Sequence, residues 1–120
     1  MTSVKLMSKN VKELLDEKVI EFNSRIDDNP EFSKKIQGKD RTICICVSDG
    51  DNYATKLENM RVEKFVKTDN TDADLVVTAN SELLVGLINR EISPIKVYIS
   101  GALKVHSKKI MDMLLLKQLF

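Results

Sequence analysis

The chain has 120 residues, of which 42% are hydrophobic and 31% are charged, and its formal net charge is +1. This length and composition are typical of one folded domain with its own core, and they exclude an intrinsically disordered chain. Because Lys plus Arg (19) nearly equals Asp plus Glu (18), the basic excess of a nucleic-acid-binding protein is absent. We therefore expect a single domain over residues 1–120 that does not bind nucleic acid.

The chain also lacks recognisable targeting signals. No apolar run reaches the ~18 residues that a membrane-spanning helix needs. The first residues lack the apolar block of a secretory signal, and the last residues do not form a peroxisomal address. Because two cysteines without an export signal are typical of a reducing compartment, we expect a cytoplasmic protein.

The N-terminal part of the chain predicts two helices. Apolar residues recur three and four positions apart over residues 11–26, which is the pattern of a helix with one buried face. Ser8 or Asn10 would cap the start of this helix. Pro30 then begins a second, shorter helix and Gly38 follows its end, because proline fits the first helical turn and glycine fits the position after the last.

From residue 41 the pattern changes to that of β-strands. The pair Asp49-Gly50 is a strong hairpin signal, so two strands are expected on either side of it. A third strand is expected over residues 61–68. The apolar run over residues 73–79 predicts a fourth strand that lies buried in the centre of the sheet.

The last part of the chain predicts a helix, a strand and a helix. Asn80 would cap a helix over residues 81–90. Pro94 begins a short turn, a fifth strand is expected over residues 102–105, and Ser107 would cap a final helix. This order predicts an α+β fold, with a single five-stranded, mainly antiparallel sheet and helices packed on one face.

The cysteines and the histidine do not form a metal site. Cys44 and Cys46 lie two residues apart on a predicted strand, so their side chains point to the same face. A zinc site would need two more soft ligands, and the one histidine, His106, lies far along the chain. We interpret the cysteines as small buried residues and His106 as an exposed linker residue, and we expect no metal.

Other motifs also indicate a protein without a cofactor or a catalytic group. The acidic cluster of Asp69, Asp72 and Asp74 lacks the glycine and the final glutamate of a calcium-binding loop, so we interpret it as a solvated loop. The four glycines form neither a phosphate-binding loop nor a nucleophile elbow. From these patterns we expect no cofactor and a protein that is not an enzyme.

The predicted last helix carries more apolar residues than one buried stripe needs. Residues 110–120 place Ile, Met, Leu and Phe almost all round the helix, whereas covering a sheet requires one face. The excess suits a ligand, a partner chain such as a second copy in a homodimer, or transient contact with a membrane surface. It is also compatible with a terminal helix that leaves a few leucines exposed.

The second half of the chain resembles the sterol carrier protein type-two domain family. The resemblance rests on residues 74–78, the capped helix after them, Ser93-Pro94, residues 100–105 and the apolar helix at the end. It is best from residue 74 to about residue 114. The order of helices and hairpin upstream also agrees with the family fold.

This resemblance implies an apolar tunnel between the sheet and the helices. Members of the family bind fatty acids, fatty acyl-CoA, sterols or other lipids without transforming them, so it implies a small protein for lipid binding or transfer. The tunnel walls that it implies are Phe22, Phe32, Ile45, Val77, Leu84, Leu87, Ile88, Val97, Ile99, Leu103, Ile110, Met113 and Leu114. A lipid head group would lie at the basic end, near Lys104, Lys108 or Lys109.

Arg90, Ser107 and Gly101 are the positions near the implied tunnel that could alter its shape. Arg90 and Ser107 stand where the family commonly has glycine. Ser107 can cap a helix, whereas Arg90 could reshape or plug the rim of the tunnel, which leaves the ligand class open. Gly101 is expected to let the backbone turn sharply into an edge strand, at a place where a side chain would crowd the cavity mouth. A plain bulge glycine is the alternative.

Two other functions remain open from the sequence. One is an interaction subunit whose apolar last helix docks a partner or a second copy of the chain. The other is an enzyme that acts on an acyl-CoA substrate with His106 as its general base. Non-catalytic lipid binding is the leading interpretation.

Overall fold

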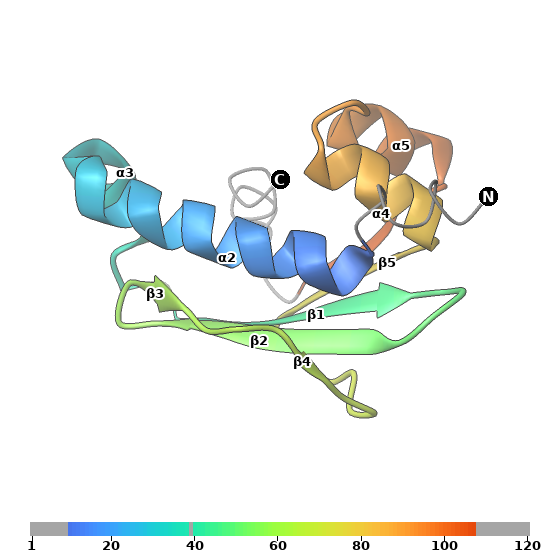
Figure 1. The fold of residues 1–120 in the computed structure, drawn as a ribbon, viewed down its shortest axis with the longest axis horizontal. Helices are drawn as coiled ribbons and strands as arrows, with labels where there is room; N and C mark the ends of the chain where they lie inside the picture. The colour runs from blue at the N-terminus through green and yellow to red at the C-terminus, as the bar shows by residue number, and fades with distance from the viewer. Residues whose placement is uncertain (1–9, 39, 108–120) are drawn as a thin grey trace.

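The described helices all lie on the same side of one sheet (Figure 1). The computed structural model describes residues 10–38 and 40–107, so the predicted final helix over residues 108–120 lies outside the described part of the chain. Within that part the order is two helices, five strands, two helices and a last strand. The predicted α+β class is confirmed.

Two helices that share a boundary residue form the N-terminal part. α2, Val11–Asp28, is capped by Asn10, whose side chain accepts a hydrogen bond of 2.9 Å from the backbone N–H of Glu13. Asn29 ends α2 and caps α3, Pro30–Ile36, by accepting two bonds of 3.1 Å from its first backbone N–H groups. Both predicted helices are confirmed, and so is Pro30 in the first turn of α3.

The predicted hairpin forms one half of the sheet. β1, Arg41–Val47, pairs antiparallel with β2, Asn52–Glu58. β5, Leu75–Ala79, lies on the other side of β1 and runs parallel to it. The strand order is β3-β2-β1-β5-β6, with β4 also paired to β2, and the other pairings are antiparallel. The sheet is therefore mainly antiparallel, with β5 in an inner position as predicted.

Asp74 fixes the start of β5 against β1. One of its carboxylate oxygens accepts hydrogen bonds from the backbone N–H and the hydroxyl of Thr42, at 2.9 and 3.2 Å. The hydroxyl of Thr42 in turn accepts from the backbone N–H of Asp74 at 2.9 Å. The prediction of simple loop solvation is therefore wrong for Asp74, because this carboxylate ties two strands together.

The predicted third strand is divided into β3, Arg61–Val62, and β4, Val66–Lys67, so the sheet has six strands rather than five. Both pair with β2, but the connection between them has one residue more than the segment of β2 that it faces. This is a β-bulge. Thr55 donates its hydroxyl to the carbonyl of Glu63 within the bulge, and Phe65 is buried in the core. Because Phe65 is buried in the core, residues 63–65 interrupt the regular pairing of this strand with β2.

The segment after β5 forms two helices and an edge strand. α4, Ser81–Ile88, is capped by Asn80 as predicted, through a hydrogen bond of 2.8 Å to its side chain. The turn expected before the last strand is a short helix, α5, Pro94–Ser100. β6, Lys104–Ser107, begins at residue 104 rather than 102, because the chain first leaves α5 through Gly101. β6 pairs with β5 at the edge of the sheet.

Gly101 explains the turn from α5 towards this edge strand. Its φ of +88° lies in the left-handed region that favours glycine, and its N–H donates to the carbonyl of Tyr98 at 3.2 Å. The predicted sharp turn is confirmed. The prediction that a side chain would crowd a cavity mouth finds no support among the described residues, because none of their atoms lies within 4 Å of a Cβ placed on Gly101. The requirement for glycine therefore comes from the backbone.

The core fills the space between the helices and the sheet. Ile43, Ile45 and Val47 of β1 are buried in this core, whereas Cys44 and Cys46 alternate with them and point to the opposite face. From the helices, the core receives Leu14, Leu15, Val19, Phe22, Phe32, Leu84, Leu87 and Ile88.

Asn23 of α2 forms two hydrogen bonds with β3 at the edge of the sheet. Its amide donates to the carbonyl of Val62 and accepts from the N–H of Val62, both at 2.9 Å. Val62 is buried, so Asn23→Ala leaves two backbone groups without this partner and should lower the free energy of unfolding by about 2 kcal/mol in urea denaturation. Ser24→Ala, which removes an exposed bond of 3.4 Å to Asp28, is the control. Equal losses in the two variants would contradict the prediction.

Candidate functional site

Most of the predicted tunnel walls meet in the layer between the helices and the sheet. Val97 is half-buried against this layer, and Ile99 is exposed on α5. Ile110, Met113 and Leu114 lie outside the described residues. The predicted walls that are buried together in the core are Phe22, Phe32, Ile45, Val77, Leu84, Leu87, Ile88 and Leu103.

Two hollows adjoin this layer at the helices, and an ion pair links a lining residue of one to a lining residue of the other. A hollow of about 280 Å³ is formed by the turn between α4 and α5 and by Leu87. A smaller one of about 130 Å³ lies between α2 and the end of α4, beside Leu14 and Ile88. Arg90 lines the first and Glu21 lines the second, and the guanidinium of Arg90 donates to the carboxylate of Glu21 at 2.6 Å. This pair therefore links the linings of the two hollows.

Arg90 occupies a backbone conformation that suits glycine better. Its φ is +62°, in the left-handed region, which explains why glycine is common at the corresponding place in the family that the sequence resembles. The arginine keeps this conformation, and its side chain joins the α4–α5 turn to α2 through Glu21. The departure from glycine thus places a cation at the larger hollow.

Lys18 is a buried cation at the smaller hollow. It lies four residues after Leu14 and four before Phe22, and this spacing is the sequence signal that would have placed it on the buried face of α2. Its ammonium lies 3.5 Å from both carboxylate oxygens of Glu21, which is long for a charge-assisted hydrogen bond. Glu21 therefore receives two cations and binds Arg90 more closely than Lys18.

α5 borders the larger hollow and presents apolar side chains outward. Pro94, its first residue, lines the hollow, and no residue of this helix is buried. Ile95, Tyr98 and Ile99 are exposed by 57%, 46% and 77%. Their spacing of three and four residues places them on one side of the helix. An apolar surface therefore lies beside the hollow.

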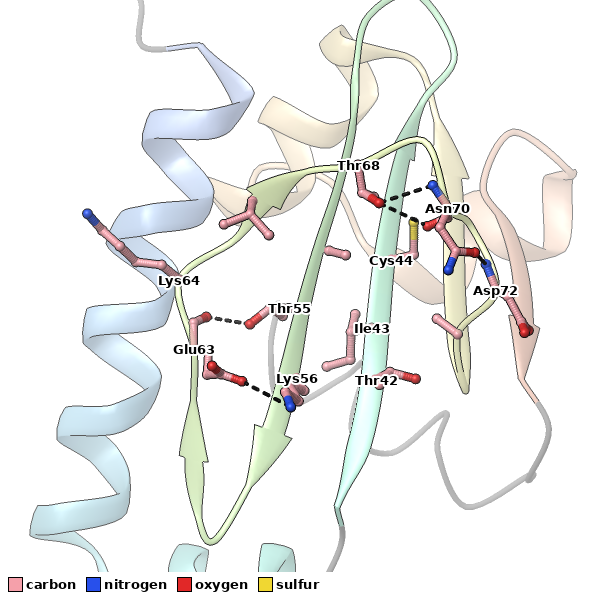
Figure 2. Close-up of a pocket in the computed structure, with 13 residues that line it drawn as sticks. Thr42, Ile43, Cys44, Thr55, Lys56, Glu63, Lys64, Thr68, Asn70 and Asp72 are labelled. Atoms are coloured by element: carbon pink, nitrogen blue, oxygen red, sulfur yellow. Dashed lines mark hydrogen bonds and ion pairs between the residues drawn. The ribbon is translucent and has the colours of Figure 1, made fainter.

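A third hollow, of about 320 Å³, lies on the face of the sheet that the helices leave open (Figure 2). One wall is the loop with Thr68, Asn70 and Asp72, in which the hydroxyl of Thr68 and the side chain of Asn70 each accept from a backbone N–H two residues on. Lys56 forms an ion pair of 3.9 Å with Glu63 at the other side. The polar groups of the loop are thus paired with one another, while apolar atoms make up the larger part of the lining.

Cys44 lies at this third hollow as a protonated thiol. It is buried, while Cys46 is half-buried, so the predicted burial holds fully for Cys44. Their sulfur atoms are 3.7 Å apart. Burial, followed by the hydrogen bond to Cys46 and its charge, raises the pKa of Cys44 to about 12. A thiol with this pKa is a poor nucleophile at neutral pH.

The predicted head-group cation Lys104 lies on the same open face of the sheet. In the register of β6 against β5 it is opposite Thr78, and both Lys104 and His106 are exposed. Lys104 therefore points away from the layer that contains the buried walls. Lys108 and Lys109, the other predicted head-group residues, lie outside the described part of the chain.

Neither a metal cluster nor a membrane-spanning helix is found in the part of the chain that the structure describes. Among residues 10–38 and 40–107, no group of three or more His, Cys, Asp or Glu side chains could hold a metal ion. None of the described helices is both long and apolar enough to cross a bilayer.

No family model and no curated protein matches the chain, but solved structures do. Sterol carrier protein 2 from Aedes aegypti, in complex with palmitate, matches with a TM-score of 0.64 at 11% identity, over 92% of this chain and 94% of that one. The ubiquinone synthesis protein UbiJ-SCP2 matches with a TM-score of 0.60 at 17% identity, over 84% and 88% of the two chains.

The likeness extends over most of both chains, and a sterol carrier protein 2 from Yarrowia lipolytica repeats it, with a TM-score of 0.55 at 16% identity over 82% and 87% of the chains. The chain has the sterol carrier protein 2 fold. A sec-alkylsulfatase from Pseudomonas sp. also matches, with a TM-score of 0.57 at 19% identity over 72% of this chain, but this chain spans only 13% of that enzyme. The resemblance in the sequence is thus confirmed as a resemblance of fold.

Replacing Arg90 separates the strain of its backbone from the value of its ion pair. Both Arg90→Gly and Arg90→Ala lose the pair with Glu21, which joins two half-exposed side chains and is worth at most about 1 kcal/mol. Glycine relaxes at a φ of +62° and alanine does not, so Arg90→Gly should be more stable than Arg90→Ala by about 1 kcal/mol. Urea denaturation measures the difference, and equal stabilities would contradict the left-handed conformation.

The raised pKa of Cys44 predicts unequal reactivity of the two thiols. In the folded protein at neutral pH, iodoacetamide should modify Cys46 first and leave Cys44 largely unmodified, as measured by mass spectrometry of peptides. In urea both should react. Because the unfolded chain loses the Cys44 proton at a lower pH than the folded one, stability should fall as the pH rises from the ordinary thiol range towards 12. Faster modification of Cys44 than of Cys46 is the contrary result.

Proposed function

We propose that this protein binds a lipid without transforming it, in the layer between the helices and the sheet. The observation that carries the proposal is the fold, which matches nearly the whole length of a sterol carrier protein 2 in complex with palmitate. The walls that the sequence resemblance implies support it, because eight of them are buried together in this layer. A fatty acid or a similar single-chain lipid is therefore our candidate ligand.

The larger hollow beside α5 is the entrance that the geometry favours. It leads from the α4–α5 turn to Leu87, which belongs to the buried layer. Side chains fill the layer behind it, so an entering chain must displace α5 and the turn before it. This uncovers Val97 and Ile92, which are half-buried against the core, but no fully buried residue of α5, so it costs less free energy than moving α4. The segment is thus suited to admit a ligand.

The energetics of an alkyl chain are sufficient for this entry. Burying sixteen carbons gains roughly 12 kcal/mol, at about 0.8 kcal/mol for each methylene. Lost motional freedom and the ordering of the chain remove a large part of this gain. The remainder supports binding in about the micromolar range, without a dedicated polar clamp.

Lys18 and Arg90 are the cations best placed for an anionic head group. Both approach the carboxylate of Glu21, which lines the smaller hollow at this junction of α2 with the end of α4. A lipid carboxylate at this junction would compete with Glu21 for Lys18, whose bond to Glu21 is the longer one. Lys104 is less suitable because it lies on the open face of the sheet.

Native mass spectrometry of the freshly purified protein, followed by extraction and identification of bound lipid, tests the proposal. We expect a near-stoichiometric acyl lipid, and displacement of a fluorescent fatty acid by palmitate after that lipid is removed. A protein that carries no lipid and fails to bind the fluorescent fatty acid would show that the layer is an ordinary filled core.

The head-group assignment has its own test in Lys18→Met. This variant should bind palmitate about tenfold more weakly than the original protein, since it loses one charge-assisted contact. It should bind hexadecanol, which has no charge, equally well. Lys12→Met on the same helix is the matched control, because Lys12 pairs with Asp16 outside the hollows. Equal affinity of the two variants for palmitate contradicts the role of Lys18.

A further inference from the structure

α5 is a helix whose apolar side faces outward. Val97 is half-buried against the core, while Ile95, Tyr98 and Ile99 on the same helix are exposed. A helix of seven residues is too short to be stable by itself in water. An exposed apolar group of this kind, beside a hollow, is typical of a surface that is covered in use.

A single cation, Lys96, lies among these side chains. Residues 92–100, from the turn to the end of α5, contain Lys96 and no Asp or Glu, and the preceding residue, Glu91, lines the larger hollow. Lys96 is exposed on α5 itself, next to Ile95. This combination of isoleucine, tyrosine and lysine is complementary to a bilayer with anionic head groups, because tyrosine prefers the interface and lysine reaches the phosphates.

We propose that the α5 surface, formed by Ile95, Lys96, Tyr98 and Ile99, docks this protein on an anionic lipid bilayer. The inference rests on the proposed function, since a bilayer is the source from which a lipid ligand is taken. Pro94 joins the α5 surface to the larger hollow. Docking therefore brings the entrance of the hollow close to the acyl chains.

The size of the α5 surface favours a bilayer over a protein partner. Stable protein interfaces involve about 20–30 residues on each side, whereas α5 contributes three exposed apolar residues. A bilayer needs no matching shape and accepts a small apolar insertion. A surface of this size gives weak, reversible binding, as a protein that collects and releases a ligand requires.

Sedimentation with vesicles tests the docking. The chain should bind vesicles of phosphatidylcholine mixed with phosphatidylserine more strongly than vesicles of phosphatidylcholine alone. The double variant Ile95→Ser/Tyr98→Ser should bind the mixed vesicles about tenfold more weakly, because it loses two inserted side chains. The matched controls are Ile20→Ser on α2 and Val66→Ser on β4, whose side chains are 70% and 60% exposed elsewhere on the molecule. Both controls should bind as the original protein does.

A tryptophan provides a direct readout of insertion, because the chain has none. The emission of Tyr98→Trp should shift to shorter wavelength when mixed vesicles are added, and that of Ile20→Trp should not. This comparison does not depend on whether the double variant folds. Equal shifts at both positions, or no shift at position 98, overturn the proposal.

The remaining outcomes separate docking from ligand binding and from self-association. If the double variant fails to bind vesicles but still binds the fluorescent fatty acid in solution, the proposal is supported. Vesicle binding through α5 by a chain that binds no fatty acid supports docking and defeats the proposed function. If light scattering shows that the original protein is a dimer and the double variant a monomer, a second copy covers α5, and the proposal is overturned. It is also overturned if the double variant still binds the vesicles.

Discussion

The parallel pairing of β1 with β5 is the constraint on which the rest of the structure depends. Parallel neighbours cannot be joined by a tight turn, so the chain that leaves the last residue of β1 must return to the end at which β1 began before β5 can start. It does so through the hairpin, the bulge and a loop that ends at Asp74. The reciprocal bonds between Asp74 and Thr42 fix where β5 starts. With β5 held there, α4 follows directly over the core and β6 closes the edge.

This arrangement gives the two faces of the sheet different chemistry. The helices cover one face with a continuous apolar layer, whereas the returning loop covers part of the other with hydroxyl, amide and carboxylate groups. An alkyl chain gains free energy by leaving water only where its neighbours are apolar. The hollow of about 320 Å³ on the open face has a largely apolar lining, but it lies across the sheet from the layer that the helices cover. The hollows at the helices are the ones that reach Leu87 and Ile88 of that layer, and this access favours them as the entrance for a lipid.

The features that could be predicted from the sequence depend on local interactions. Asn10 and Asn80 cap their helices through backbone groups three residues away, and the Asp-Gly turn forms its hairpin between adjacent strands. The division of the third strand could not be predicted, because Phe65 leaves the ladder to meet side chains from distant helices. The role of Lys18 was also hidden, since its buried surroundings come from both α2 and α4. The turn at Gly101 was predicted from the backbone freedom of glycine and its positive φ agrees, whereas the added expectation of a crowded cavity mouth finds no support among the described residues.

α4 and α5 differ in the way that a lipid-binding protein with this fold would require. α4 buries Leu84, Leu87 and Ile88 in the core, so displacing it would expose large apolar side chains to water. α5 fully buries none, although Val97 and Ile92 of the turn before it are half-buried against the core, and the turn is joined to α2 by the half-exposed ion pair of Arg90, a residue in a strained backbone conformation. Opening at α5 and this turn therefore costs less free energy than opening at α4. Contact of α5 with apolar surroundings would lower this cost further, because its outward side chains would then leave water as the entrance opens.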